Sequence, residues 1–452
     1  MSLAINDVNP PFRDNIIRLC LFIIYMNETF KKFFLWARIF DDNENGNIDS
    51  SRLPVLSINA NIEPIRSTGF MLISIGVLLA ASSGGWDITN HLLNKPETFF
   101  SPPHAGLYAG VAIVVFASIL VLHNSRRSYA WAIAKYHSMI IENSNSGYTK
   151  PRLPLSPKLI ITGVAMLLVA GPFDFAWHSA FGLDGLLSPS HITLTLGLVL
   201  SSIGALVGIL SVNNSNLLNR KKNKIESVMT FISPILRSGI HEEYKSPILI
   251  VIGVISVWIT LSGLTHMLSL PFSDTEYFKF NPDPTLGAII ATLALPFLVS
   301  FILISSFQLT RKFGVLSITG GMFMTVNLIT SILPNQHLLP TIPFYMLNLI
   351  PFLAVDVLLS KLSVSNYKTT IYWVSGAILG LTFFMLYYPL DTHTYNEILA
   401  NPQPVWPSLT SSIYFGIMNK IYPLVALPSI TMGILGAIFA PRFKRNGQHI
   451  RV

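Results

Sequence analysis

The residues best suited to chemistry fall in two stretches of the chain that share one spacing. Each stretch has an aspartate, a histidine four residues later and a second histidine thirteen residues after that, written D-x3-H-x12-H. The first set is Asp87, His91 and His104, and the second set is Asp174, His178 and His191. In both copies the last histidine lies in a Ser-Pro-x-His motif. Because the spacing and the flanking motif recur together, we interpret the two stretches as copies of one unit.

This spacing predicts that each set comes together at the end of a helical hairpin. An aspartate and a histidine at positions i and i+4 lie on the same face of a helix. Pro102 and Pro189 suit the first turn of the next helix, because the N–H that proline lacks has no helical partner there. The histidine in that first turn would then face the Asp-His pair, so that one carboxylate and two imidazoles meet.

One carboxylate and two imidazoles suit a divalent transition metal such as Cu, Zn, Fe or Mn. Three protein ligands would leave a coordination position for water or substrate. The single cysteine, Cys20, excludes an intrachain disulfide and a thiolate cluster. The alternative interpretation is that these residues are hydrogen-bonded helix caps and interfacial polar groups. We favour a metal, since ionisable residues near a membrane are costly and usually functional.

The stretches WDITNHLLNKPETFFSPPH and FDFAWHSAFGLDGLLSPSH resemble the C subunit of the particulate methane and ammonia monooxygenases, which are copper membrane monooxygenases. That family carries D-x3-H-x12-H at the top of a transmembrane hairpin, with a T-P-S-H-like element around the last histidine. The resemblance covers about the first four predicted spans, and it implies that both sets bind copper. Asp174 stands where the family has Asn in its second site.

Further ionisable residues lie near the tips of the later predicted hairpins. They are His266, Asp283, His337, Asp391 and His393. We interpret them either as secondary metal or proton-path residues, or as interfacial polar groups. Asp356 lies inside an apolar stretch, where it either caps or pairs within the helical bundle or takes part in proton movement, and we favour the structural role.

The composition predicts a membrane protein. Of the 452 residues, 51% are hydrophobic and only 12% are charged, whereas soluble domains carry about 25% charged residues. Apolar runs long enough to span a bilayer occur at 67–86, 104–123, 158–178, 191–211, 247–268, 285–309, 314–334, 342–360, 369–389 and 409–440. We therefore predict an all-α fold: a polytopic membrane bundle of about ten transmembrane helices, built from five hairpin repeats.

Basic residues are concentrated in alternate connections and in the tail. By the positive-inside rule, both termini are then cytoplasmic, and the metal sites lie on the outer side of the cell membrane. The predicted regions are 1–66, a cytoplasmic amphipathic segment and linker; 67–211, the duplicated metal-binding hairpins; 212–246, a cytoplasmic basic loop; 247–440, six spans with degenerate hairpins; and 441–452, a basic cytoplasmic tail.

These observations predict a copper-binding integral membrane protein, similar to a monooxygenase C subunit and acting as an oxidoreductase component. Its expected partners are membrane lipid, other membrane subunits and a small-molecule substrate of unassigned kind. Nucleic acid is not expected, because the net charge of +8 is assigned to cytoplasmic loops. Two alternatives stay open: a metal transporter or acquisition protein, and a zinc-dependent intramembrane hydrolase with Glu97 or Asp184 as general base.

Overall fold

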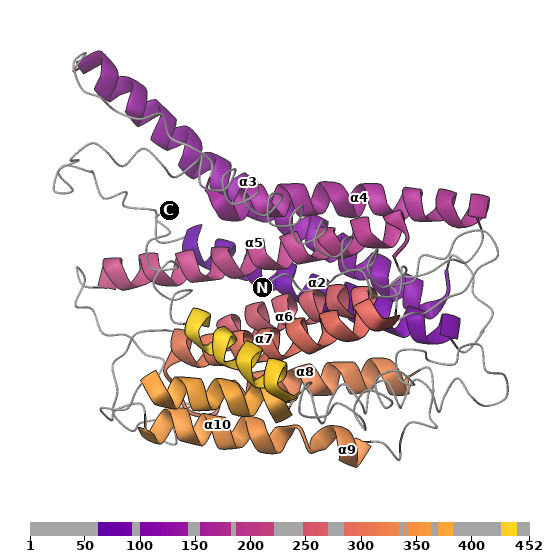
Figure 1. The fold of residues 1–452 in the computed structure, drawn as a ribbon. Helices are drawn as coiled ribbons and strands as arrows, with labels where there is room; N and C mark the ends of the chain where they lie inside the picture. Colours follow the sequence, from indigo (N-terminus) through magenta and orange to yellow (C-terminus); the bar gives the residue numbers. More distant parts are fainter. Residues whose placement is uncertain are drawn as a thin grey trace, which may run out of the picture.

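The computed structural model describes residues 62–92, 100–142, 154–181, 187–220, 247–269, 284–333, 339, 342–362, 369–382 and 426–440. Within these stretches the regular secondary structure is helical, which confirms the predicted all-α fold class (Figure 1). The predicted segment 1–66 lies almost wholly outside the described residues.

The helices of the first half are α2 (Ile62–Leu92), α3 (Pro102–Glu142), α4 (Leu155–Phe181) and α5 (Pro189–Arg220). They are followed by α6 (Pro247–Ser269), α7 (Pro284–Thr310), α8 (Val315–Ile332), α9 (Ile342–Met346) and α10 (Leu349–Leu362). Two further helices cover 369–382 and Ala426–Ala440.

Six of these helices are long and apolar enough to cross a bilayer, a requirement of about 20 residues. Their apolar stretches are Ile65–Asn90, Pro102–Asn124, Leu155–Ala180, Pro189–Val212, Pro247–Ser269 and Ile289–Thr310. These six match the first six predicted spans, and the chain is accordingly an integral membrane protein. The four later predicted spans correspond to shorter described helices, so a total of ten spans stays a prediction.

One predicted span is divided in the structure. The stretch 342–360 forms α9 and α10, with a turn at Leu347 and Asn348 between them. Pro351 lies in the first turn of α10, where its missing N–H is tolerated. Within a continuous helix the same proline would clash with the carbonyl of Leu347, four residues earlier.

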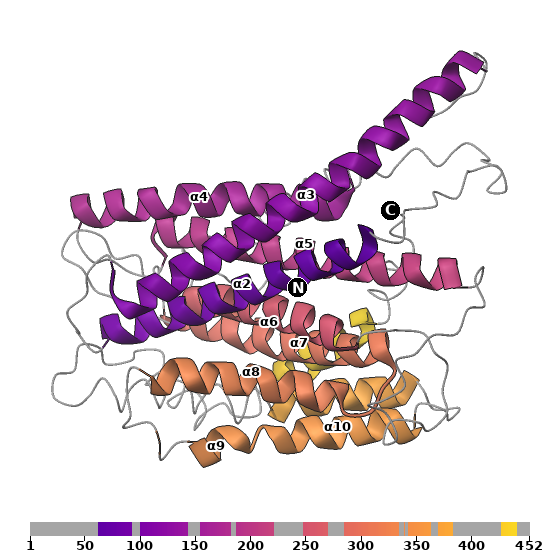
Figure 2. The same ribbon diagram turned by 180° about the vertical axis from the view of Figure 1, so that it is seen from behind.

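Helix α3 extends well past its membrane stretch. It continues from Asn124 to Glu142, into the basic connection that follows the second predicted span, and projects beyond its neighbours (Figures 1 and 2). Helix α5 likewise continues to Arg220. The first parts of both predicted basic loops are therefore helical.

The first four helices form two antiparallel pairs, α2 with α3 and α4 with α5, and each pair makes a close contact at two glycines. A Cβ added to Gly110 would lie 2.7 Å from the carbonyl oxygen of Gly76, and a Cβ on Gly197 would lie 3.0 Å from that of Gly163. Such contacts exclude larger residues and let helix backbones approach closely in a membrane.

The two glycine pairs occupy equivalent positions. In each pair of helices, one glycine precedes the aspartate by eleven residues, and the other follows the final histidine by six. Equivalent contacts at equivalent positions support a duplicated hairpin unit. The proposed extension of this repeat to five hairpins stays a prediction.

The buried centre of the bundle lies nearer α5 and α6 than α3 and α4. In the most apolar windows of α5 and α6, 61% and 67% of residues are buried, against 28% in both α3 and α4. The α3 and α4 helices lie along one edge of the bundle (Figure 1). They therefore present much of their apolar surface to lipid.

The second half packs around Trp258 of α6. Its indole stacks on the ring of Phe323 in α8, with ring centroids 3.8 Å apart. Buried Asp356 of α10 accepts hydrogen bonds from the backbone N–H and the hydroxyl of Ser317, at 3.0 and 2.9 Å. Because Ser317 lies in the first turn of α8, Asp356 satisfies an N–H without a helical partner. This contact supports a structural role for that carboxylate.

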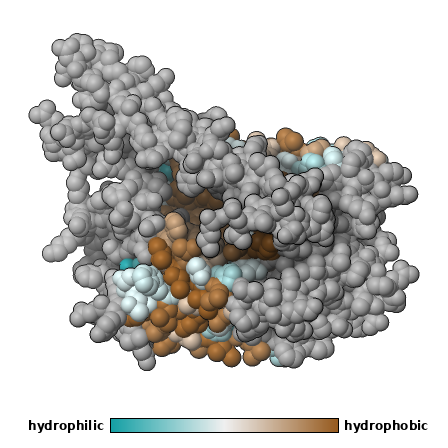
Figure 3. Space-filling view, viewed as in Figure 1, coloured by the Kyte–Doolittle hydropathy of each residue, from teal (hydrophilic) through white to brown (hydrophobic). Residues whose placement is uncertain are grey.

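Apolar side chains also cover the outside of the second half. Ile350 and Leu353 of α10 are 65% and 52% exposed. Trp373 and Val374, in the helix 369–382, are also exposed. The described atoms visible in Figure 3 are mostly apolar over the lower helices. An exposed apolar exterior is expected for a surface that faces lipid tails.

Candidate metal centre

Helices α4 and α5 bring the second set of residues together at one end of the bundle. Asp174 and His178 lie one turn apart in the last part of α4, which ends at Phe181. His191 is the third residue of α5, which begins at Pro189 as the Ser-Pro motif predicted. The Ser188 hydroxyl accepts a hydrogen bond from the His191 backbone N–H at 3.3 Å. This cap fixes the helix start and thereby the position of His191.

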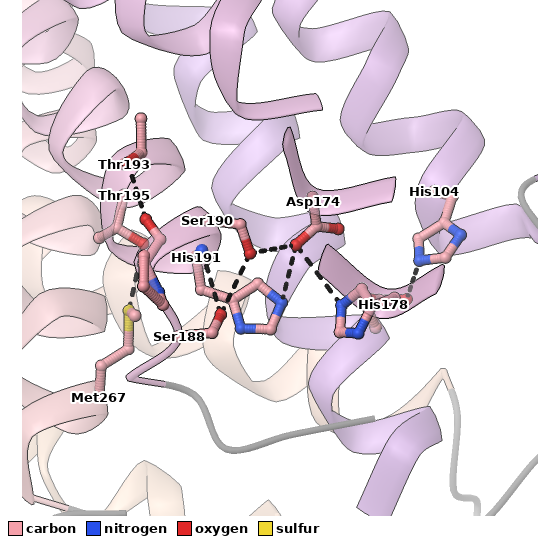
Figure 4. A network of polar contacts seen from close by, with 11 residues as sticks. His104, Asp174, His178, Ser188, Ser190, His191, Thr193, Thr195 and Met267 are labelled. Carbon is pink, nitrogen blue, oxygen red and sulfur yellow. Dashed lines mark hydrogen bonds and ion pairs between the residues drawn. The ribbon is translucent and has the colours of Figure 1, made fainter. Parts of the chain in front are cut away.

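The three side chains of this set converge on one point. Nε2 of His178 lies 3.4 Å from Oδ1 of Asp174, and Nε2 of His191 lies 3.3 Å from the same oxygen. One potential ligand atom from each residue lies within 4.8 Å of the others. Figure 4 shows the carboxylate of Asp174 between the two imidazoles. We call these three residues the α4–α5 triad.

These separations suit a shared metal ion. Bonds of about 2 Å in tetrahedral geometry hold neighbouring ligand atoms about 3.3 Å apart. Both distances from the Asp174 oxygen match that separation. The side chains are 25–37% exposed, so the triad is accessible rather than sealed. A carboxylate and two imidazoles therefore form an accessible donor set for a divalent transition metal.

A serine that the motif analysis did not assign completes the centre. Ser190 donates a hydrogen bond to Oδ1 of Asp174 at 2.7 Å, and its hydroxyl lies 3.2 Å from that of Ser188. Both serines are fully buried. Hydrogen bonds from such partners orient ligands around metal ions. Ser190 could have been found from the sequence, because it occupies the variable position of the Ser-Pro-x-His motif.

The first set lies at the same end of the bundle, at the tip of α2 and α3. Nε2 of His104 lies 2.9 Å from Oδ1 of Asp87, so these two predicted ligands are together. Helix α3 begins at Pro102, again as predicted. The side chain of His91 lies outside the described residues. The position equivalent to Ser190 is Pro103, which has no hydroxyl to donate.

Tyr108 of α3 lies near both sets, and the sequence analysis missed it. Its phenol is close enough to both Asp174 and Asp87 to interact electrostatically with each carboxylate. Its ring centroid is 6.1 Å from that of His104, one helical turn away. In the view of Figure 4, His178 lies between His191 and His104. Tyr108 could have been found from the sequence, because it follows His104 by four residues and therefore lies on the same side of the helix.

The predicted secondary residues do not join the α4–α5 triad among the described side chains. His266 lies in the last turn of α6, with its Nε2 atom buried. The next residue, Met267, accepts a hydrogen bond from Thr195 of α5 at 3.1 Å, which holds the end of α6 against α5. The remaining predicted residues, Asp283, His337, Asp391 and His393, lie outside the described residues.

Comparison with known proteins adds no relative to this chain. No protein-family model matches the sequence, and no curated protein and no solved structure is significantly similar to it.

Proposed function

We propose that this chain is a membrane metalloprotein that binds a transition metal, copper foremost, at Asp174, His178 and His191. The observation that carries the proposal is the convergence of three ligand atoms, from two helices, to within 4.8 Å of one another. Imidazole and carboxylate ligands without thiolate suit Cu(II), Zn or Fe(II). The resemblance to monooxygenase C subunits favours copper among them.

The same proposal assigns Asp87, His91 and His104 to a second, related site. The side chains of Asp87 and His104 are in contact. The glycine contact between α2 and α3 also matches the one between α4 and α5, the helices of the triad. A metal at either site would supply Lewis-acid or redox chemistry. The protein would hold it with the imidazoles, balance its charge with the aspartates and orient Asp174 through Ser190.

The position of the ligands favours an oxidoreductase component or a metal-acquisition protein over a transporter. Transporters built from repeats place their sites near the middle of the membrane, usually at broken helices. Asp174 and His191 instead lie in the last part of α4 and the first turn of α5, at one end of the bundle. Similarity to a monooxygenase subunit then favours the oxidoreductase role, with other membrane subunits as partners.

Metal analysis of the detergent-purified full chain tests this proposal. We expect bound copper with a Cu(II) resonance showing nitrogen coupling, and a loss of metal in His178→Ala and His191→Ala. The matched control is His123→Ala, which removes an exposed histidine from the far end of the α3 membrane stretch. Zinc in place of copper would support the hydrolase alternative. Equal metal content in all variants would show that the triad binds no metal.

A further inference from the structure

An apolar groove opens on the lipid-facing edge of the bundle, beside both sets of metal-site residues. It is lined by seven α3 residues between Leu107 and Ile119, by Leu167, Leu168 and Gly171 of α4, and by Leu194 of α5. Its volume is about 450 Å³, within the range of about 300–1,000 Å³ typical of small-molecule sites. We call it the α3–α4 groove.

The groove is open to the bilayer. Phe116, Ile119 and Leu168 are 62%, 59% and 56% exposed, although all lie within membrane stretches. The phenol of Tyr108 is the one polar side chain among the lining residues. A lipid-exposed hollow with this lining takes an apolar chain rather than water, because water would find almost no hydrogen-bonding partner in it.

One end of the groove meets the metal-site residues on three helices. Tyr108 follows His104 by four residues, Gly171 precedes Asp174 by three, and Leu194 follows His191 by three. Residues three or four apart lie on the same side of a helix. Each of these three lining residues is therefore about one helical turn from a metal-site residue, on the same side of its helix.

The length of the groove suits a lipid chain. Leu107 and Ile119 are twelve residues apart, a separation of about 18 Å along an α-helix. One leaflet of a bilayer has a hydrocarbon thickness of about 15 Å, half of the whole core. The groove is thus long enough for a single lipid chain, whose polar end would lie at Tyr108 and the metal-site residues.

We propose that the α3–α4 groove binds one acyl chain of a membrane phospholipid, with the ester group of that chain beside Tyr108 and the α4–α5 triad. The proposed metal site would then act next to a lipid ester, which makes a phospholipid the class of ligand presented to it. The placement of the ester rests on the proposed metal function, whereas chain binding in the groove does not.

The chain offers matched glycines for the test. A Cβ on Gly171 or on Gly263 of α6 would meet no atom within 4 Å, so both positions accept a larger residue. Gly171→Phe places a ring in the groove, and Gly263→Phe adds the same ring to a residue that does not line it. Ala112→Phe blocks the groove from α3, far along the chain from Asp174.

The experiment uses the full chain in vesicles that contain a phosphatidylcholine with a photoreactive diazirine on one acyl chain. Peptide mapping should find stronger labelling at 107–119 and 167–171 than at Ile350 and Leu353, which are lipid-exposed but outside the groove. Gly171→Phe and Ala112→Phe should each lose most of the groove labelling, and Gly263→Phe should keep it. Equal labelling at both regions, or full labelling in both groove variants, would overturn the proposal.

A second measurement locates the ester. With Cu(II) bound, phospholipids carrying a nitroxide close to the ester should relax faster than those with a nitroxide near the methyl end. The opposite order would refute the proposed direction of the chain. Metal content is measured on the same samples. Groove-specific labelling without bound metal would reject the metal function alone, and bound metal without groove-specific labelling would reject the lipid site alone.

Discussion

The α2–α3 and α4–α5 hairpins carry the same ligand spacing and the same glycine contact, yet their polar tips differ. In the α4–α5 hairpin the aspartate oxygen lies 3.3 and 3.4 Å from two imidazole nitrogens and accepts a hydrogen bond from Ser190. In the α2–α3 hairpin the Asp87 oxygen lies 2.9 Å from His104. Among the described side chains, the aspartate therefore lies closer to the final histidine in the α2–α3 hairpin than in the α4–α5 hairpin, although the two sequences have equal spacing.

This difference separates two influences on a site. The spacing D-x3-H-x12-H puts the aspartate and the first histidine on one helix face and the last histidine in the first turn of the next helix. The residue before the final histidine decides how the aspartate is held. Ser190 donates to Asp174, whereas Pro103 at the equivalent position has no hydroxyl. We expect the two sites to bind metal with unequal affinity for this reason.

Removing a direct ligand should have the largest effect on this comparison. We expect His191→Ala to weaken metal binding at the α4–α5 triad by more than about 100-fold, since loss of an outer-shell partner alone costs about 10–100-fold. His104→Ala should affect only the α2–α3 site. Competitive metal titration of the purified variants measures both effects. A variant that loses metal at both sites would show that the two hairpins form one coupled centre.

The glycine contacts should show whether the hairpins are structurally equivalent. Gly110→Ala and Gly197→Ala should each destabilise the protein by about 1–3 kcal/mol, the usual range for overpacking. The effect should be larger at Gly110, where a Cβ would lie 2.5 Å from the backbone nitrogen of Ala80. Thermal unfolding in detergent measures the change. Gly263→Ala, which meets no neighbour, is the control. Loss at one hairpin alone would argue against equivalent packing.

Exchanging the residue before the final histidine should reduce the difference between the sites. Ser190→Ala removes the hydrogen bond to Asp174, and we expect metal affinity at the α4–α5 triad to fall about tenfold, as for other outer-shell partners. Pro103→Ser should raise affinity at the α2–α3 site if the new hydroxyl reaches Asp87. Titrations in the His104→Ala and His191→Ala backgrounds assign each change to one site. Unchanged metal affinity in Ser190→Ala would show that the hydrogen bond to Asp174 does not cause the difference between the two sites.

Loop charge should contribute the smallest difference. The first loop contains Lys95 and Glu97, and the second contains Asp184 and no basic residue, although these positions lie outside the described residues. A nearby cation opposes a metal ion, so Lys95→Gln should strengthen binding at the α2–α3 site by a few-fold at most, and less at high salt. Binding at low and high ionic strength tests this. A weakened site would indicate that Lys95 and Glu97 neutralise one another.

The amino-acid sequence by itself determined the helical class and the position of the first six spans. A backbone in lipid must satisfy its own hydrogen bonds, so a long apolar run has few alternatives to a helix. The sequence also determined that Asp174 and His178 share a helix face, and that Pro189 begins α5, because both depend only on local geometry.

Only the tertiary structure decided what each of these residues meets. The approach of His191 to Asp174, the hydrogen bond from Ser190 and the position of Tyr108 near both aspartates depend on how helices pack. Packing of this kind rests on contacts between residues distant in sequence, such as Gly163 with Gly197. Spacing along one chain fixes the face on which a side chain lies, but the separation and tilt of two helices arise only when their surfaces fit together.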